Sequence, residues 1–208
     1  TAHCMLEIFF QSFVLYFVVI DPLAAAPLFL IVTQGLKIKN KLKTAFEATL
    51  IATLILIFFA ILGNFILSYL QISLSAFTIA GGIILFLISL EMLFDKRSQR
   101  KEDEIKENSA ATGIFPLAIP LLAGPAAITS VMVSVADMGT NLMSQATGLL
   151  ALIFVMILTF ISFYVVSKSS KIINKKVTSV ISRVIGIILA GLSLSLIHIS
   201  EPTRRRGI

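Results

Sequence analysis

The chain has 208 residues, of which 57% are hydrophobic and only 13% are charged, and its mean hydropathy is +0.99. A soluble domain of this size needs more polar surface, so the composition excludes that class and indicates a polytopic membrane protein. The formal charge of +6 does not indicate nucleic-acid binding, because the basic residues lie in loops between apolar segments and not on a basic, aromatic surface domain.

Both ends of the chain carry residues that we expect to be foreign to the domain. The run Leu194–Arg204 resembles a translated sequencing-library adapter, so residues 194–208 are treated as read-through and kept out of the fold reasoning. Met5 is typical of a natural start, and residues 1–4 are then translated upstream sequence. The predicted single integral-membrane domain covers residues 5–193.

Without these ends the chain holds no histidine and no cysteine, since His3, His198 and Cys4 all lie in them. Their loss removes the usual zinc ligands and any Cys–His nucleophile. The sequence also lacks a P-loop, an HExxH motif and a GxSxG motif. We therefore predict that the protein is not an enzyme and has no metal site and no cofactor.

Six apolar segments reach the spanning length of roughly 20 residues. They are Leu6–Gln34, Thr44–Leu70, Leu74–Phe94, Gly113–Ala136, Gln145–Ser167 and a segment that runs from Thr178 to the foreign tail. As one straight helix the first segment would be roughly 43 Å long, more than the hydrocarbon core of about 30 Å, so it must tilt or break. The sequence predicts an all-α protein with six transmembrane helices.

The basic residues of this domain follow the odd-numbered segments. The first such loop is Lys37–Lys43, and the loops after the third and fifth segments are also basic, with Arg183 close behind the last of them. The loops after the second and fourth segments contain no Lys or Arg. Because cytoplasmic loops are enriched in basic residues, we expect the odd-numbered loops in the cytoplasm and both termini outside.

Two short motifs recur in the two halves of the domain, residues 5–94 and 113–193. The proline pair Pro22 and Pro27 is matched with Pro120 and Pro125, and the run Gly82–Leu85 is matched with Gly186–Leu189. Because each half holds three spans, the second copy must lie upside down in the membrane. Inverted 3+3 repeats are a recurrent transporter architecture, and we expect one here.

The prolines also predict that the first and fourth helices are broken. Proline lacks the backbone N–H and its ring clashes with the preceding turn, and irregular backbone is tolerated in lipid only where protein buries it or where it lines a cavity. The predicted break residues are Pro22, Pro27, Pro120 and Pro125. The alternative is that these prolines make ordinary packing kinks, as they do in many membrane helices.

Asp21 is the only carboxylate well inside a predicted span. An ionised carboxylate at that depth costs at least about 2.5–3.5 kcal/mol, which marks it as a functional residue. The structural alternative is a helix N-cap, because Asp followed by Pro is a helix-start signature and the side chain can accept N–H bonds near Ala24. The two interpretations are compatible, since a capped half-helix still directs its positive end into a cavity.

Small and hydroxylated residues surround both predicted breaks and complete the predicted substrate site. Its residues are Asp21, Pro22, Ala24, Ala25, Gly124, Pro125, Ala127, Thr129 and Ser130. Small side chains let helices or a ligand approach closely. The two hydroxyls have two alternatives, a bond to the substrate or a bond back to the preceding helical turn.

Three runs of the sequence resemble the MarC family of inner-membrane proteins, of the UPF0056 type, over essentially all of Met5–Leu192. The runs are Phe17–Phe29, Ala80–Ile83 and Phe115–Thr129, with Ala24 and Ala126 where the family often has glycine. The resemblance implies a bacterial or archaeal plasma membrane protein with six spans and broken first and fourth helices. It also implies, from some members, transport of small neutral amino acids such as glycine or alanine.

These observations together predict a secondary transporter of small neutral solutes, with alternating access around a midplane site between helices one and four. Its expected partners are a small-molecule substrate and the lipid bilayer, and no nucleic acid. Coupling to H+ or Na+, the direction of transport and assembly into a homo-oligomer are left open. The alternative is an integral membrane protein with a structural or regulatory role and no transported substrate.

Overall fold

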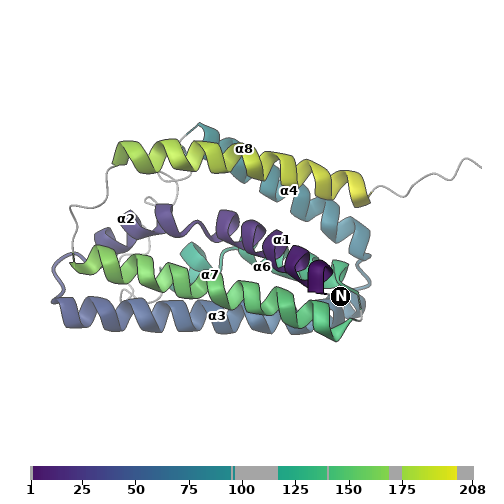
Figure 1. Ribbon diagram of the computed structural model, residues 1–208, viewed down its shortest axis with the longest axis horizontal. Helices are drawn as coiled ribbons and strands as arrows, with labels where there is room; N and C mark the ends of the chain where they lie inside the picture. The colour runs from purple at the N-terminus through teal and green to yellow at the C-terminus, as the bar shows by residue number, and fades with distance from the viewer. Residues whose placement is uncertain (1, 95, 97–116, 140, 169–174, 201–208) are drawn as a thin grey trace, which may run out of the picture.

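The computed structural model describes residues 2–94, 96, 117–139, 141–168 and 175–200. Over these ranges the chain is helical and contains no strand (Figure 1). The elements are α1 (Ala2–Ile20), α2 (Pro22–Val32), α3 (Ile38–Tyr69), α4 (Leu74–Leu93), the short π-helix η1 (Leu117–Leu122), α6 (Pro125–Asp137), α7 (Leu142–Lys168) and α8 (Lys175–Ser200).

Four stretches of these helices are long and apolar enough to cross a membrane. They are Met5–Val32, Ile38–Tyr69, Ser75–Leu93 and Leu142–Lys168, and shorter apolar stretches cover Pro125–Asp137 and Ser179–Ser195. The predicted all-α fold is confirmed over the described residues, in which four helical stretches, and not the expected six, have the length and hydropathy of a membrane span and two more apolar helices are shorter.

The helices form a bundle in which α7 packs against α1, α2 and α3, while α6 packs against α3, α4 and α1. The pair α4 and α8 lies along one side of this bundle, where it contacts α6, α1 and α2 (Figure 1). The broken pair α1 and α2 and the broken pair η1 and α6 are therefore held in the interior, between the long helices.

Helix α3 presents one face of small residues to the bundle. Ala45, Ala48 and Ala52 are fully buried, and Ala60 and Gly63 continue the same face about two and three turns further along. Small residues at three- and four-residue spacing let helix backbones approach closely in a membrane, where tight packing and not water exclusion drives association. The opposite face of α3 carries exposed Leu and Phe side chains, as expected for contact with lipid.

Helices α4 and α8 pack most closely at two glycines. A β-carbon built on Gly82 would lie 3.1 Å from the carbonyl oxygen of Ser193, and one built on Gly186 would lie 3.1 Å from the carbonyl oxygen of Ser89. Gly82 lies early in α4 and touches the end of α8, whereas Gly186 touches the end of α4. The two helices are therefore antiparallel.

The basic segment Lys37–Lys43 differs from the loop expected from the sequence. Lys37 is the N-cap of α3, and the helix begins at Ile38, so the following lysines lie on its first turns. Lys43 forms an i,i+4 ion pair with Glu47, with 3.7 Å between Nζ and Oε1.

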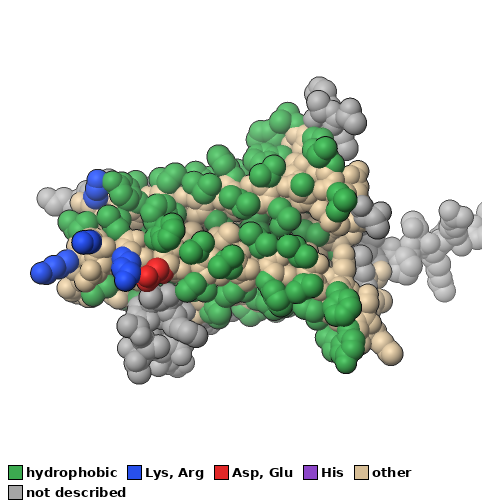
Figure 2. Space-filling view, turned by 90° about the horizontal axis from the view of Figure 1, so that it is seen from below, with side chains coloured by type: hydrophobic (Ala, Val, Ile, Leu, Met, Phe, Trp, Pro, Cys, Tyr) green, Lys and Arg blue, Asp and Glu red, His purple; other side chains and the backbone are tan. Residues whose placement is uncertain are grey.

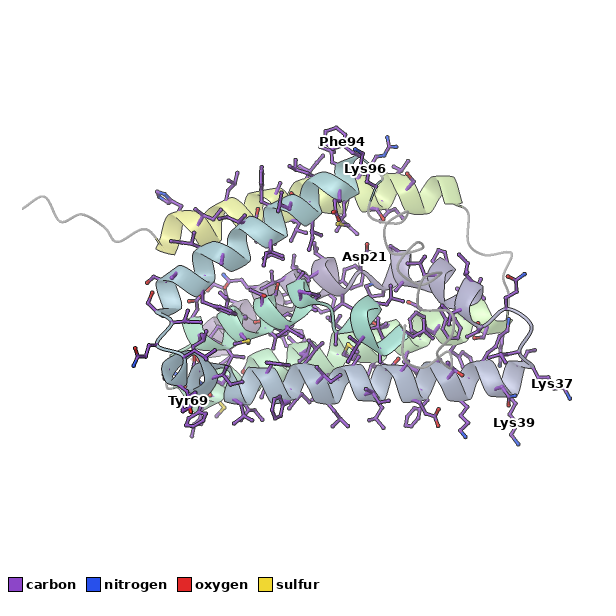
Figure 3. All side chains as sticks on the ribbon, turned by 180° about the vertical axis from the view of Figure 1, so that it is seen from behind. Asp21, Lys37, Lys39, Tyr69, Phe94 and Lys96 are labelled. Carbon is purple, nitrogen blue, oxygen red and sulfur yellow. The ribbon has the colours of Figure 1, made fainter. Side chains whose placement is uncertain are left out.

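The lysines at the start of α3 lie at one end of the bundle, whereas Lys96, after α4, lies nearer the middle of its length (Figure 3). Lys37 and Lys39 lie at one end of α3, and Tyr69 lies at the other (Figure 3). On the face shown in Figure 2, the basic side chains gather at a single end, and hydrophobic side chains cover the length of the bundle.

Candidate functional site

The first helix is interrupted at a single residue, Asp21. Its backbone is left-handed, with φ 54° and ψ 69°. The Asp21 N–H donates to the Phe17 carbonyl at 2.9 Å, and the Asp21 carbonyl accepts from the Ala25 N–H at 3.0 Å. The following Pro22 disfavours a right-handed helical conformation at Asp21, and aspartate is among the few residues that tolerate the left-handed region. Backbone hydrogen bonding thus continues on both sides of a one-residue break.

The Asp21 side chain is buried and only half satisfied. It is 1% exposed, and its Oδ1 accepts a hydrogen bond from the Ala24 N–H at 3.2 Å, so the predicted N-cap is present. Its Oδ2 has no hydrogen-bond partner among the described residues. An unsatisfied buried carboxylate oxygen is costly, and in a native protein it needs an explanation such as a proton, a ligand or a water molecule.

The second break is longer and involves two prolines. Ile119, before Pro120, is extended, with φ −134° and ψ 125° inside η1, and Gly124, before Pro125, is extended, with φ −76° and ψ 169°. Both conformations follow from the steric restriction that proline places on the residue before it. The helix α6 then starts with Pro125 as its first residue, and its N-cap Gly124 supplies no side-chain hydrogen bond.

The four predicted break prolines hold different positions in the structure. Pro22 and Pro125 are each the first residue of a helix that follows a break, whereas Pro120 lies inside η1. Pro27 does not end a helix, because α2 continues through it to Val32. The break in the first segment is therefore at Pro22, and the break in the second half ends at Pro125.

The predicted site residues lie at the two breaks, and most are buried. Ala24, Ala25 and Ala127 are buried, Gly124 is half-buried and Pro125 is exposed. Helix α2 packs against η1, so the two broken segments are in contact on this side. Asp21 lies midway along the bundle, between the end with Lys37 and the end with Tyr69 (Figure 3).

The two predicted hydroxyl ligands bond within their own helix. Thr129 Oγ1 donates to the Pro125 carbonyl at 2.8 Å, and Ser130 Oγ donates to the Ala126 carbonyl at 2.7 Å. The back-bonding alternative is thus the one present here. The Thr129 methyl group packs against Gly81 of α4, where a β-carbon would lie only 2.6 Å away.

Sequence reasoning missed a hydroxyl cluster between α1 and α6. Tyr16 is 1% exposed and is hydrogen-bonded to the side chains of Ser12 and Ser134. A usable signal was present, since Ser12 and Tyr16 lie four residues apart on one face of an apolar helix, as do Ser130 and Ser134. Polar residues repeated at that spacing in a membrane span indicate contact with another helix through hydrogen bonds.

Residues 6–200 match the family described as MarC family integral membrane protein. The UPF0056 membrane protein MJ1677 of Methanocaldococcus jannaschii is 32% identical over 195 residues, which cover 92% of this chain and 95% of that relative. The UPF0056 membrane protein YvbG of Bacillus subtilis is 30% identical over 198 residues, which cover 93% of each chain. No solved structure gives a significant match. With a family match across nearly its whole length and relatives in archaea and bacteria, the chain belongs to the MarC family of integral membrane proteins.

Proposed function

We propose that the protein is a secondary transporter of small neutral solutes, such as small neutral amino acids, in the plasma membrane. The observation that carries the proposal is the buried carboxylate of Asp21. It lies at the start of a half-helix midway along the bundle, and its Oδ2 lacks a hydrogen-bond partner among the described residues. Intramembrane carboxylates at broken helices characterise the substrate and ion sites of transporters.

The proposed architecture is a six-span inverted repeat in which η1 and α6 form the broken fourth helix. A nearly constant spacing supports it. Pro22 and Pro125 are 103 residues apart, while the first residues of α3 and α7, Ile38 and Leu142, are 104 residues apart. Gly82 and Gly186 are also 104 residues apart and make matching contacts. An accidental resemblance between two prolines does not account for nearly equal spacing at three separate places.

The two breaks offer different chemistry to a zwitterion. At α2 the cap is the Asp21 carboxylate, which suits an ammonium group or a coupled H+ or Na+. At α6 the cap is Gly124, and the first N–H groups receive no side-chain hydrogen bond. An uncapped helix N-terminus favours a carboxylate through its N–H groups and its dipole. In this proposal the substrate lies between the breaks, with its ammonium group toward Asp21 and its carboxylate toward α6.

The orientation follows from the charges. Lys37 and Lys39 lie at one end of the bundle, and we assign that end to the cytoplasm because cytoplasmic loops are enriched in basic residues. The end with Tyr69 and the start of α1 then faces outward. Alternating access in such folds moves one repeat against the other around a fixed central site.

The test is counterflow of labelled glycine and alanine in proteoliposomes that contain the full chain. Asp21→Asn keeps an oxygen that can cap α2 and tolerates the left-handed backbone, but it removes the charge. We expect it to lower the exchange rate at least about tenfold, because the substrate loses one hydrogen bond to a charged group. The matched control is Glu47→Gln, an acid-to-amide change at the surface ion pair, which should exchange at the rate of the original chain.

Two results would count against the proposal. If the original chain exchanges neither glycine nor alanine nor any other small neutral solute, the structural or regulatory role without a substrate is the better interpretation. If exchange is present and Asp21→Asn leaves it unchanged, Asp21 serves only as a helix cap, and the solute site lies elsewhere.

A further inference from the structure

An open cavity of about 580 Å³ lies at the end of the bundle opposite Lys37 and Lys39. It is bounded by the first half of α1, the last turn of α6 and the start of α7, with α8 on one side (Figure 1). None of the residues predicted for the substrate site lines it. The cavity is therefore a feature separate from the two helix breaks, and a function for it does not depend on transport.

The polar part of the cavity wall is rich in hydroxyl groups and holds one carboxylate. Gln11, Ser12, Ser134 and Ser144 contribute amide and hydroxyl groups, and Asp137 contributes the single charge among the described residues that line the cavity. Ser12 and Ser134 are held in place by their hydrogen bonds with buried Tyr16. Ser195, in the tail that we expect to be foreign to the domain, also lines the wall.

The field in this cavity favours a cation for two independent reasons. Asp137 is the last residue of α6, so its negative charge adds to the negative end of the helix dipole at the same place. The lysines at the start of α3 lie at the other end of the bundle. Their distance from the cavity exceeds the Debye length, so salt screens their charge. A cation at the cavity mouth thus meets the attraction of Asp137, and Lys37 and Lys39 are too far away to oppose it.

The rest of the wall is apolar and comes from three helices. It is formed by Ile8, Leu15, Val133, Met138 and Leu192. A cavity of this size, with a mostly apolar wall and a few convergent polar groups, has the character of a small-molecule site, and it is larger than glycine or alanine requires. We propose that this cavity binds an organic ammonium compound, its cationic group at Asp137 and its apolar body against Leu15, Val133 and Leu192.

The first experiment measures the charge preference of the cavity by thiol labelling of the purified full chain. A Cys4→Ser background removes the only cysteine, and Ser144→Cys, or Gln11→Cys as a second variant, places a thiol in the cavity wall. Tyr69→Cys, at the same end but outside the cavity, gives the intrinsic ratio of the labelling rates of the trimethylammonium-ethyl and sulfonatoethyl methanethiosulfonate reagents, because a thiolate itself reacts faster with the cationic one. In either cavity variant this ratio should be about two- to fivefold higher than in Tyr69→Cys, the range that an exposed charge pair produces. Asp137→Asn should return the ratio to that of Tyr69→Cys.

The second experiment identifies the class of ligand. Benzylamine at millimolar concentration should slow labelling of the Ser144→Cys variant, and neutral benzyl alcohol of nearly the same shape should slow it much less. In the Asp137→Asn background the two compounds should slow labelling equally. If the reagents label Tyr69→Cys but neither cavity variant, lipid or side chains fill the space, and the proposal is wrong. Equal protection by the amine and the alcohol would leave an apolar pocket without the proposed ammonium site and would also overturn it.

Discussion

Gly82 of α4 and Gly186 of α8 make the same contact with each other's helix. At each of them a β-carbon would lie 3.1 Å from a serine carbonyl, that of Ser193 for Gly82 and that of Ser89 for Gly186. Both serines donate their hydroxyl to the carbonyl three residues earlier, at 2.6 Å for Ser89 and 2.7 Å for Ser193. The contact between the two helices is thus close, antiparallel and reciprocal, and glycine is required at both crossing points.

The first prediction is that Gly186→Ala destabilises the protein. A β-carbon there would lie 3.0 Å from Met92 Cβ, 3.1 Å from the Ser89 carbonyl and 3.3 Å from the Leu93 nitrogen. These are backbone or near-backbone atoms that cannot rotate away, and overpacking of this kind costs about 1–3 kcal/mol. Reversible unfolding in mixed detergent micelles, followed by helical circular dichroism, measures the change in free energy.

Gly191 provides the matched control on the same helix. A β-carbon there would meet no atom within 4 Å. Gly191→Ala should therefore stabilise α8 by roughly 0.5–1 kcal/mol, because alanine loses less backbone entropy in a helix than glycine does. If both alanine variants changed stability equally, the close contact at Gly186 would not be the cause.

The second prediction concerns the aromatic contact between α2 and α7. The rings of Phe29 and Phe163 are both fully buried and lie stacked, with centroids 4.5 Å apart and planes 10° apart. Phe29→Ala should cost about 3–5 kcal/mol of unfolding free energy, whereas Phe65→Ala, on the exposed face of α3, should cost little. A double-mutant cycle with Phe163→Ala should give a coupling of about 0.5–1.5 kcal/mol. A coupling near zero would show that the two rings stabilise the protein independently.

The third prediction separates the cap from the charge at Asp21. Asp21→Ala loses the bond to the Ala24 N–H and forces alanine into a left-handed conformation, so it should lower stability by about 1–3 kcal/mol. Asp21→Asn keeps both features and should be at least as stable as the original chain, since it removes a buried charge. Equal stability of the two variants would contradict a capping role for this side chain.

The fourth prediction is a pH dependence that arises from Asp137 at the end of α6. Partial burial of this carboxyl, which lies where the apolar helix α6 ends, raises its pKa above its ordinary value of 3.8. Between the unfolded and the folded pKa the native state binds more protons than the unfolded state, so this group's contribution to stability falls as the pH rises. The stability of Asp137→Asn relative to the original chain should therefore increase from about pH 4 to pH 7. A relative stability that fell over this range would mean that Asp137 is favoured in its charged form.

The sequence predicts the helical class and the position of the apolar segments well and helix ends poorly. Hydropathy locates the apolar segments because it reports directly on contact with lipid, and the long spans coincide with them. It does not report where a helix begins, so Lys37–Lys43 read as a loop although α3 begins at Ile38. Lysine is a good helix former, and a helix that extends beyond the lipid can carry it without penalty.

The residues of the substrate site stay a prediction, whereas the helix cap at Asp21 is confirmed. Asp21 and its cap follow from local rules that concern four neighbouring residues, and these rules hold in the structure. The sequence matched Pro22 and Pro27 with Pro120 and Pro125 from their spacing. In the structure Pro125, like Pro22, is the first residue of a helix, a property that depends on which backbone N–H groups are bonded. The hydroxyl cluster at Tyr16 depends on contact between two distant helices, which spacing along one helix cannot specify.

A one-residue break has a mechanical consequence for the protein. Since hydrogen bonding is helical on both sides of Asp21, two torsion angles determine the direction of the whole of α2. This helix has 11 residues, and at 1.5 Å per residue it acts as a lever arm of roughly 16 Å. A torsional change of about 15° would displace its far end by about 4 Å. The ring of Phe29 is stacked on Phe163 near that far end, and this contact opposes the rotation of α2. The break that permits the rotation and the contact that restrains it therefore lie at the two ends of the same short helix.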